Sequence, residues 1–146
     1  MRLLALDPGL TTGYAIFSNG HIERCGHCTS LVETVDLVLT PPLDAVVYEG
    51  FARGNSVVDE QLRTIELCGA IQAAAHLGRL KCSMQYPAMR KGYVPIAKCM
   101  VKDLGFTYEE MHHAIDAIAH GLCYMDKEGI EWEKQHYLRK AFPSAD

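Results

Sequence analysis

The pair Asn19-Gly20 lies between two short apolar segments and restricts the start of the fold more than any other feature of the sequence. Asn-Gly adopts the positive φ angles that a two-residue hairpin turn requires, so the flanking segments are expected to pair antiparallel. An earlier apolar segment ends at Asp7-Pro8-Gly9, a combination typical of turns. The predicted strands cover residues 2–6, 14–17 and 21–28. The chain is therefore expected to begin as a meander of three strands.

Beyond these strands the sequence alternates between helical and extended patterns. Ser30 and Thr107 each precede a glutamate by three residues, which is the capping-box pattern that begins a helix. Helices are predicted from Ser30 to before Pro41 and over residues 56–76, 95–103, 107–126 and 131–140, with strands over residues 45–48 and 81–86. A meander followed by alternating strands and helices is the order of the ribonuclease H-like fold. We therefore expect one α/β domain over residues 1–146, with a five-stranded mixed sheet and helices on both faces.

Charge is unevenly distributed along the chain. The 146 residues carry a net charge of −4, yet the segment from Arg79 to Lys102 contains six basic residues and no acidic one. Such a segment can follow a phosphate backbone. It can equally be an ordinary solvated surface, and composition leaves both readings open.

The sequence contains no feature that predicts a membrane or secreted protein. No apolar run is long enough to span a bilayer, and the N-terminus lacks the pattern of a secretory signal. The six cysteines are therefore expected as reduced thiols in a cytoplasmic protein. Cys25 and Cys28 form a lone CxxC motif; without a second pair, two strand thiols are a simpler interpretation than a zinc site.

Three carboxylates lie where the core pattern changes to polar. Asp7 follows the first predicted strand, Glu49 follows the fourth, and Asp116 is surrounded by apolar residues in a helix. Functional sites of mixed α/β sheets gather beyond the strand ends, so Asp7 and Glu49 are expected side by side if their strands are neighbours. The helix then has to bring Asp116, and His113 on the same helical face, to that edge.

Each of these residues also has a purely structural explanation. Asp7 could belong only to an Asx turn, and Glu49 could simply be solvated. Asp116 is harder to explain in this way, because an unpaired buried charge is costly. Converging carboxylates repel one another unless a cation neutralises them, and Mg²⁺ prefers such hard oxygen ligands. Two ions about 4 Å apart can activate a water and stabilise the leaving 3′ oxygen, so the set of three predicts phosphodiester hydrolysis.

Three motifs, in this order, resemble those of the RuvC family of Holliday-junction resolvases. Met1–Ala15 has the family's apolar strand, Asp-Pro-Gly and a strand with Thr and Gly. Val47–Asn55 has a Glu before a Phe and a later Asn, and His113–Ala117 has a His three residues before Asp-Ala. The resemblance covers most of the chain, and the motifs are specific as a set although each one alone is weak.

The resemblance implies a metal-dependent endonuclease that cuts branched DNA, above all four-way junctions, and acts as a homodimer. By that likeness Asp7, Glu49, His113 and Asp116 hold Mg²⁺ or Mn²⁺, with two ions per site. An imidazole is a softer ligand than a carboxylate and tolerates Mn²⁺ better than Mg²⁺. Activity in Mn²⁺ is therefore expected to be at least equal to activity in Mg²⁺.

The resemblance also assigns a role to the basic segment, because family members place lysines after the strand that here ends near Tyr86. Lys98 is expected beside the scissile phosphate as a catalytic residue that stabilises developing charge. Residues expected to bind DNA are Phe51, Arg53, Arg90, Lys91 and Lys102.

Three other functions remain open at this point. A YqgF-like RNA-processing nuclease shares the Asp-Pro-Gly opening, although Glu49 followed by Phe51 favours DNA. An actin-like or sugar-kinase module also begins with a strand and Asp-x-Gly-x-Thr, but it needs a second phosphate loop and a longer chain. A non-catalytic DNA-binding protein of the same fold would tolerate loss of the carboxylates, whereas here Asp7, Glu49 and Asp116 are all present.

Overall fold

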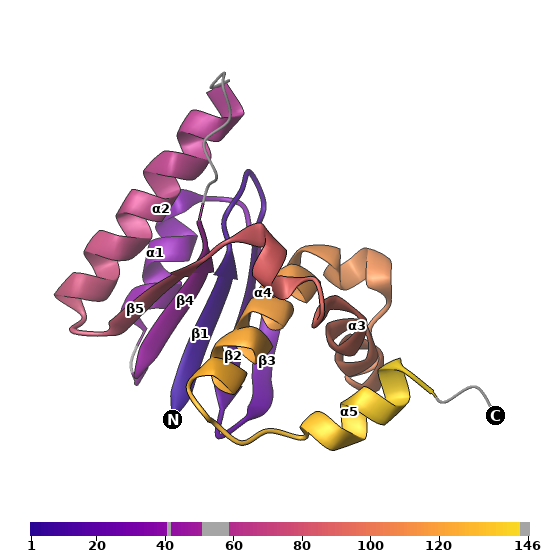
Figure 1. The fold of residues 1–146 in the computed structure, drawn as a ribbon. Coiled ribbons are helices and arrows are strands. Elements are labelled where there is room, and N and C mark those ends of the chain that lie inside the picture. The colour runs from indigo at the N-terminus through magenta and orange to yellow at the C-terminus, as the bar shows by residue number, and fades with distance from the viewer. Residues whose placement is uncertain (41, 51–58, 144–146) are drawn as a thin grey trace.

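The computed structural model describes residues 1–40, 42–50 and 59–143. They form a five-stranded sheet in the order β3-β2-β1-β4-β5, with helices on both faces (Figure 1). The strands are β1 (Arg2–Asp7), β2 (Thr12–Ser18), β3 (His21–Cys28), β4 (Ala45–Glu49) and β5 (Lys81–Gln85). The helices are α1 (Leu31–Leu39), α2 (Asp59–Leu77), the 3₁₀ helix η1 (Pro87–Arg90), α3 (Val94–Asp103), α4 (Tyr108–Lys127) and α5 (Lys134–Ala141). The predicted mixed sheet of the ribonuclease H-like fold is confirmed.

The sheet is antiparallel on one side of β1 and parallel on the other. β1, β2 and β3 form the predicted meander, and Asn19 and Gly20 have φ angles of 47° and 83° in the turn between β2 and β3. β4 pairs parallel with β1, and β5 pairs parallel with β4. The parallel pairing places the carboxyl ends of β1 and β4 at the same edge of the sheet.

The two predicted capping residues, Ser30 and Thr107, begin α1 and α4. The Ser30 hydroxyl accepts a hydrogen bond from the Glu33 backbone N–H at 3.1 Å. At α4 the exchange is reciprocal: Thr107 Oγ1 accepts from the Glu110 N–H, and the Glu110 carboxylate accepts from the Thr107 N–H at 2.7 Å. These bonds satisfy backbone donors that a helix leaves unpaired, and they fix where α4 starts.

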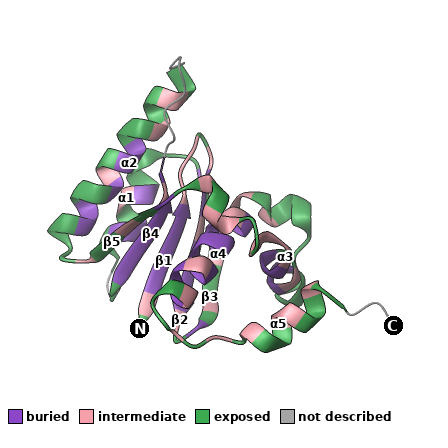
Figure 2. Ribbon diagram, viewed as in Figure 1, coloured by how far each residue is buried: buried purple, intermediate pink, exposed green. Residues whose placement is uncertain are grey.

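Buried residues run along the central strands of the sheet (Figure 2). Alternate residues of β1 belong to two separate cores, one on each side of the sheet. Leu4 and Leu6 of β1 pack with residues of α1 and α2, whereas Leu3 and Ala5 pack with residues of α3 and α4. This alternation follows from the two-residue period of a strand. Among the described residues, no helix has both the length and the hydropathy needed to cross a membrane.

The helix α4 lies unusually close to the sheet because two glycines leave room for it. A Cβ atom on Gly13 would lie 1.7 Å from the backbone oxygen of His113 in α4. A Cβ atom on Gly121 in α4 would lie 2.3 Å from the Phe17 ring. Gly13 is the register partner of Asp7, so the close approach occurs beside the carboxylate that ends β1.

We predict that Gly13→Ala destabilises the protein, because its methyl group would meet helix backbone that cannot rotate away. Overpacking of this kind costs about 1–3 kcal/mol. The matched control is Gly69→Ala in α2, where an added Cβ meets no atom within 4 Å. That change should raise stability by about 0.5–1 kcal/mol through helix propensity. Thermal unfolding of both variants tests this, and equal melting temperatures for Gly13→Ala and the wild type would contradict the close packing.

Candidate active site

Two of the predicted carboxylates lie at the carboxyl edge of the parallel strand pair. β1 and β4 pair in register up to Leu6 and Tyr48, and the next residues are Asp7 and Glu49. Both side chains are half-buried. Strand pairing alone therefore brings together two residues that lie far apart in the sequence.

The third carboxylate reaches this edge from α4. Asp116 lies one helical turn after His113, whose backbone packs against Gly13, and its neighbours Ile115 and Ala117 are buried. The Asp116 side chain retains 31% exposure, so it faces the site and not the core. The register of α4 on the sheet therefore sets the position of Asp116.

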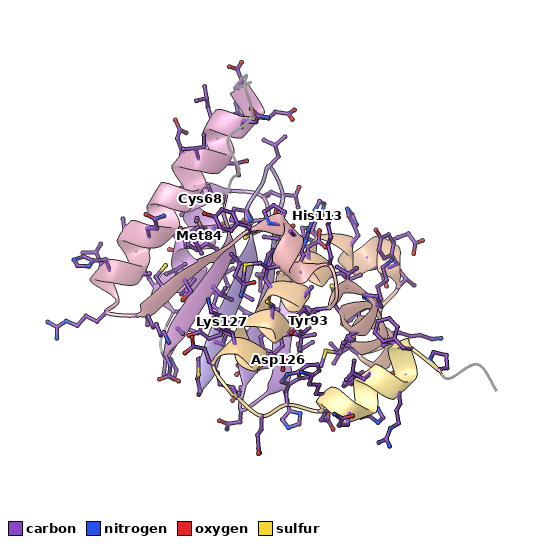
Figure 3. All side chains as sticks on the ribbon, in the orientation of Figure 1. Cys68, Met84, Tyr93, His113, Asp126 and Lys127 are labelled. Carbon is purple, nitrogen blue, oxygen red and sulfur yellow. The ribbon has the colours of Figure 1, made fainter. Side chains whose placement is uncertain are left out.

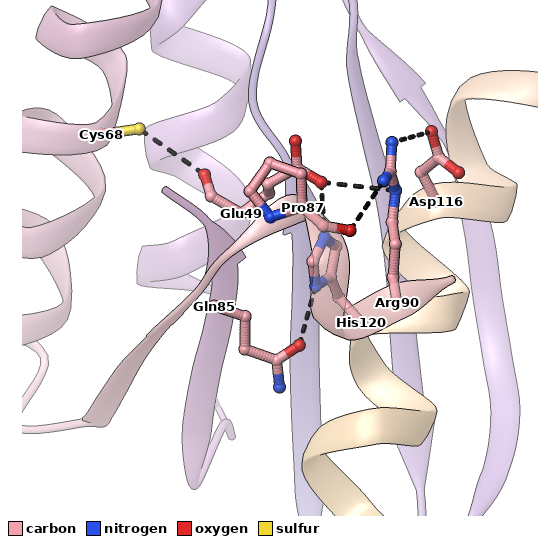
Figure 4. Close-up of polar contacts among 7 residues, drawn as sticks. All are labelled: Glu49, Cys68, Gln85, Pro87, Arg90, Asp116 and His120. Atoms are coloured by element: carbon pink, nitrogen blue, oxygen red, sulfur yellow. Dashed lines mark hydrogen bonds and ion pairs between the residues drawn. The ribbon is translucent and has the colours of Figure 1, made fainter. Parts of the chain in front are cut away.

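Arg90 joins the carboxylates. Its Nη2 donates to Asp116 Oδ2 at 3.1 Å, and its Nε lies 3.3 Å from Glu49 Oε2 (Figure 4). Its Nη1 also donates to the Pro87 carbonyl at 3.0 Å, within η1. Sequence analysis assigned Arg90 to DNA contacts, but its side chain lies in the carboxylate cluster.

A fully buried histidine, His120, contacts the Glu49 carboxylate from α4. His120 Nε2 lies 2.7 Å from Glu49 Oε2, and His120 Nδ1 lies 2.7 Å from Gln85 Oε1 (Figure 4). Both ring nitrogens are therefore engaged, and the ring links β4, β5 and α4. His120 is a core histidine, and the sequence alone did not lead us to expect its contact with Glu49. The available signal was its spacing, four residues after Asp116 on the same helical face.

Burial and the neighbouring carboxylates together change how Asp7 titrates. Burial, followed by the nearby charges of Glu49 and Asp116, raises the pKa of Asp7 from 3.8 to about 7. The Arg90 guanidinium opposes this shift. The pKa of Asp7 thus shows that the three carboxylates share one electrostatic environment, as a cation site requires.

His113 lies in α4, in its N-terminal half (Figure 3). Its ring is 6.1 Å from that of His27 in β3 and 3.9 Å from that of His112, measured between ring centres. Burial, followed by the neighbouring His112 and His27, lowers the pKa of His113, whereas Asp116 opposes the change. A lowered pKa favours the neutral imidazole, which is the form that binds a metal ion.

The basic residues that were predicted to bind DNA lie at different places on the protein. Lys98 lies in a groove of about 330 Å³ between α3 and the start of α4, and its ammonium group is 5.0 Å from the centre of the Tyr108 ring. Lys102 lines the same groove, and Lys91 is exposed after η1. Within the described part of the chain, no ion pair links Lys98 to a carboxylate of the cluster. Phe51 and Arg53 lie outside the described residues.

The donor set suits a hard divalent cation, with one obstacle. Carboxylate oxygens are the preferred ligands of Mg²⁺ and Mn²⁺. After burial, the negative charges of Glu49 and Asp116 contribute to the raised pKa of Asp7, and a cation would neutralise them. Among residues 1–40, 42–50 and 59–143, however, no three His, Cys, Asp or Glu side chains are arranged ready to hold a metal ion. Arg90 occupies the position between Glu49 and Asp116.

The Cys28 thiol of the CxxC motif contacts Thr34 Oγ1 at 3.2 Å in the core.

The pKa of Asp7 predicts that this residue destabilises the metal-free protein at high pH. Its folded-state pKa lies above the unfolded value, so the contribution of Asp7 to stability is most favourable below about pH 4 and is lost as the pH rises through about 7. Asp7→Asn removes the ionisable group and should raise the melting temperature in EDTA at pH 8 by about 4 °C or more. The difference should narrow at pH 5. Asp36→Asn, a change of an exposed carboxylate in α1, is the control and should have little effect; equal melting of Asp7→Asn and wild type at pH 8 would refute the prediction.

Comparison with known proteins shows the fold of the chain. No protein-family model and no curated protein matches the sequence. A structure of T. thermophilus RuvC in complex with a Holliday junction substrate matches with a TM-score of 0.65 and 16% identity over 89% of this chain and 97% of that chain. A further Thermus thermophilus RuvC structure matches with a TM-score of 0.61 and 18% identity, over 89% and 98% of the two chains. The chain has the fold of the RuvC resolvases over almost their whole length.

Proposed function

We propose that this protein is a divalent-metal-dependent endonuclease that cuts branched DNA, with the four-way junction as its main substrate. The observation that carries the proposal is the convergence of Asp7, Glu49 and Asp116 at one sheet edge, where each influences the electrostatics of the same site. This arrangement lies on a RuvC-like fold, and one of the similar structures contains a Holliday junction substrate.

Asp7, Glu49, His113 and Asp116 would hold Mg²⁺ or Mn²⁺, two ions per site. Bound there, the ions would activate a water and stabilise the leaving 3′ oxygen of the cut strand. His120 orients Glu49, because its Nε2 contacts Oε2 of that carboxylate while Gln85 holds the other ring nitrogen. An outer partner of this kind fixes the direction of a ligand's oxygens.

The basic residues would bind the DNA backbone. Lys98 and Lys102 share a groove with the aromatic ring of Tyr108, next to the start of α4. Lys91, which is exposed, would also contact the backbone. Arg53 and Phe51, which lie outside the described residues, stay predicted DNA-binding residues from the sequence. We assign Lys98 to the phosphate beside the cut, and the other residues to positioning of the duplex arms.

A symmetric junction requires two active sites, so we propose that the protein acts as a homodimer. We propose the cytoplasm as the place where it acts. Leu62 and Ile65 of α2 are exposed on one helical face, although both are large and apolar. Apolar residues spaced three apart on an exposed helix are typical of a helix that packs against a partner.

The cleavage assay uses purified protein with labelled four-way DNA, linear duplex and folded RNA, in Mg²⁺ and in Mn²⁺. We expect cleavage of the four-way DNA, at least as fast in Mn²⁺ as in Mg²⁺ if His113 is a ligand. Asp7→Asn should bind the junction but lose cleavage by at least about 10³-fold. Preferred cleavage of folded RNA would favour an RNA-processing nuclease, and binding without cleavage by the wild type would favour a non-catalytic protein.

Lys98→Ala should lower cleavage more than binding. Removing one group that stabilises the transition state costs about 10²-fold in rate, whereas one phosphate contact changes affinity only a few-fold. Lys127→Ala, at the opposite end of α4 from the groove, removes the same charge and should change neither quantity appreciably. Single-turnover cleavage and equilibrium binding measured on the same junction separate the two effects. Equal losses in both would mean that Lys98 only holds the backbone.

A further inference from the structure

The side chain of Arg90 occupies the centre of the proposed metal site. It contacts Glu49 and Asp116 at once (Figure 4). Its charge also acts on Asp7. Only 22% of the side chain is exposed. A guanidinium this buried, held by carboxylates on two different elements, is part of the site and not a surface charge.

Arg90 engages one oxygen atom on each of two proposed metal ligands. Asp116 Oδ2 accepts from Arg90, and Glu49 Oε2 faces Arg90 Nε while it also contacts His120. A metal ion that used either of these two oxygen atoms would compete with the guanidinium for it. Among the described residues, no three His, Cys, Asp or Glu side chains are arranged ready to hold a metal ion while Arg90 stands between these carboxylates.

Charge balance leads to the same conclusion. The three carboxylates carry a formal charge of minus three when ionised, and Arg90 reduces it to minus two. Two divalent ions bring plus four, so a site that held both ions and Arg90 would carry an excess of two positive charges in a half-buried setting. Repulsion between cations at this range is strong. The guanidinium and the full set of ions therefore disfavour each other.

We propose that Arg90 is a built-in counter-ion that competes with divalent cations for Glu49 and Asp116 and has to withdraw before the site is fully loaded. This inference rests on the metal site of the proposed function and not on its nuclease activity. In the metal-free protein Arg90 relieves the repulsion between the carboxylates. Once withdrawn, its guanidinium is free to bind a backbone phosphate of the substrate.

The structure allows this movement. Arg90 is the last residue of η1, and it is followed by the exposed Lys91 and Gly92. Its Nε is buried without a hydrogen-bond partner, because the contact with Glu49 lacks hydrogen-bond geometry. Among the described residues, its one remaining hydrogen bond is to Pro87 in the same short helix. Withdrawal therefore breaks contacts to the carboxylates and little else.

The test is calorimetric titration of DNA-free protein with MnCl₂ at fixed pH and ionic strength. Arg90→Gln should bind Mn²⁺ with a Kd about tenfold lower than the wild type, because one charged competitor is gone. Arg90→Lys keeps the charge but cannot span both carboxylates, and it should lie between the two. The matched control is Lys91→Gln, which removes the same charge from the adjacent exposed position and should leave the Kd within about twofold.

The outcomes separate the inference from the proposed function. If Arg90→Gln, shown to be folded by circular dichroism, binds Mn²⁺ no more tightly than the wild type, and Arg90→Lys agrees, the counter-ion role is wrong while the metal site stands. If Lys91→Gln tightens binding as much as Arg90→Gln, the effect is net charge and the inference is also wrong. If neither the wild type nor any variant binds Mn²⁺, the proposed metal site itself fails. Binding only by the Arg90 variants would support the inference most strongly.

Discussion

Repulsion among carboxylates at the end of the parallel strand pair is the constraint on which the site depends. β1 and β4 bring Asp7 and Glu49 together through backbone pairing, and α4 adds Asp116. The protein accommodates this charge in two ways, with Arg90 among the carboxylates and with a pKa of about 7 for Asp7. Such stored repulsion is the electrostatic condition under which a protein binds divalent cations tightly.

The sheet and α4 therefore position the residues of the site together. Backbone pairing of β1 with β4 up to Leu6 and Tyr48 fixes where the backbones of Asp7 and Glu49 follow. Asp116 and His120 depend on how α4 lies on the sheet, since one faces the cluster and the other supports Glu49. Rigid elements of this kind position ligands more accurately than loops do.

Local patterns in the sequence were sufficient to predict most of the fold. Asn19-Gly20 and the Thr107–Glu110 capping box act through neighbouring residues alone, so both could be identified without a structure. The convergence of Asp7 and Glu49 also followed, because it needs only the pairing of two strands. The 3₁₀ helix η1 was missed, since a four-residue turn has no hydrophobic period to detect.

The roles of Arg90 and His120 could not be predicted for a different reason. Arg90 belongs to a basic stretch of sequence, and only the path of the chain after β5 turns it towards the carboxylates instead of solvent. His120 has the helical spacing of a site residue, but nothing in the sequence places Gln85 and Glu49 on either side of its ring. The roles of both residues depend on contacts between elements that are distant in the sequence. Local sequence patterns do not reveal such contacts.

The surface on which α4 rests contains small side chains at its centre next to Gly121, and this limits how the protein can evolve. Ala5 and Ala15 are paired across β1 and β2 in the core beneath α4, and the position of Gly121 lies against Ala5. A larger residue at either alanine would lift the helix and carry Asp116 and His120 with it. Ordinary drift in core volume, which most domains absorb by repacking, would here misplace the carboxylates while the fold survives. Selection for activity should therefore keep the side chains at these two positions small, in addition to any selection for stability.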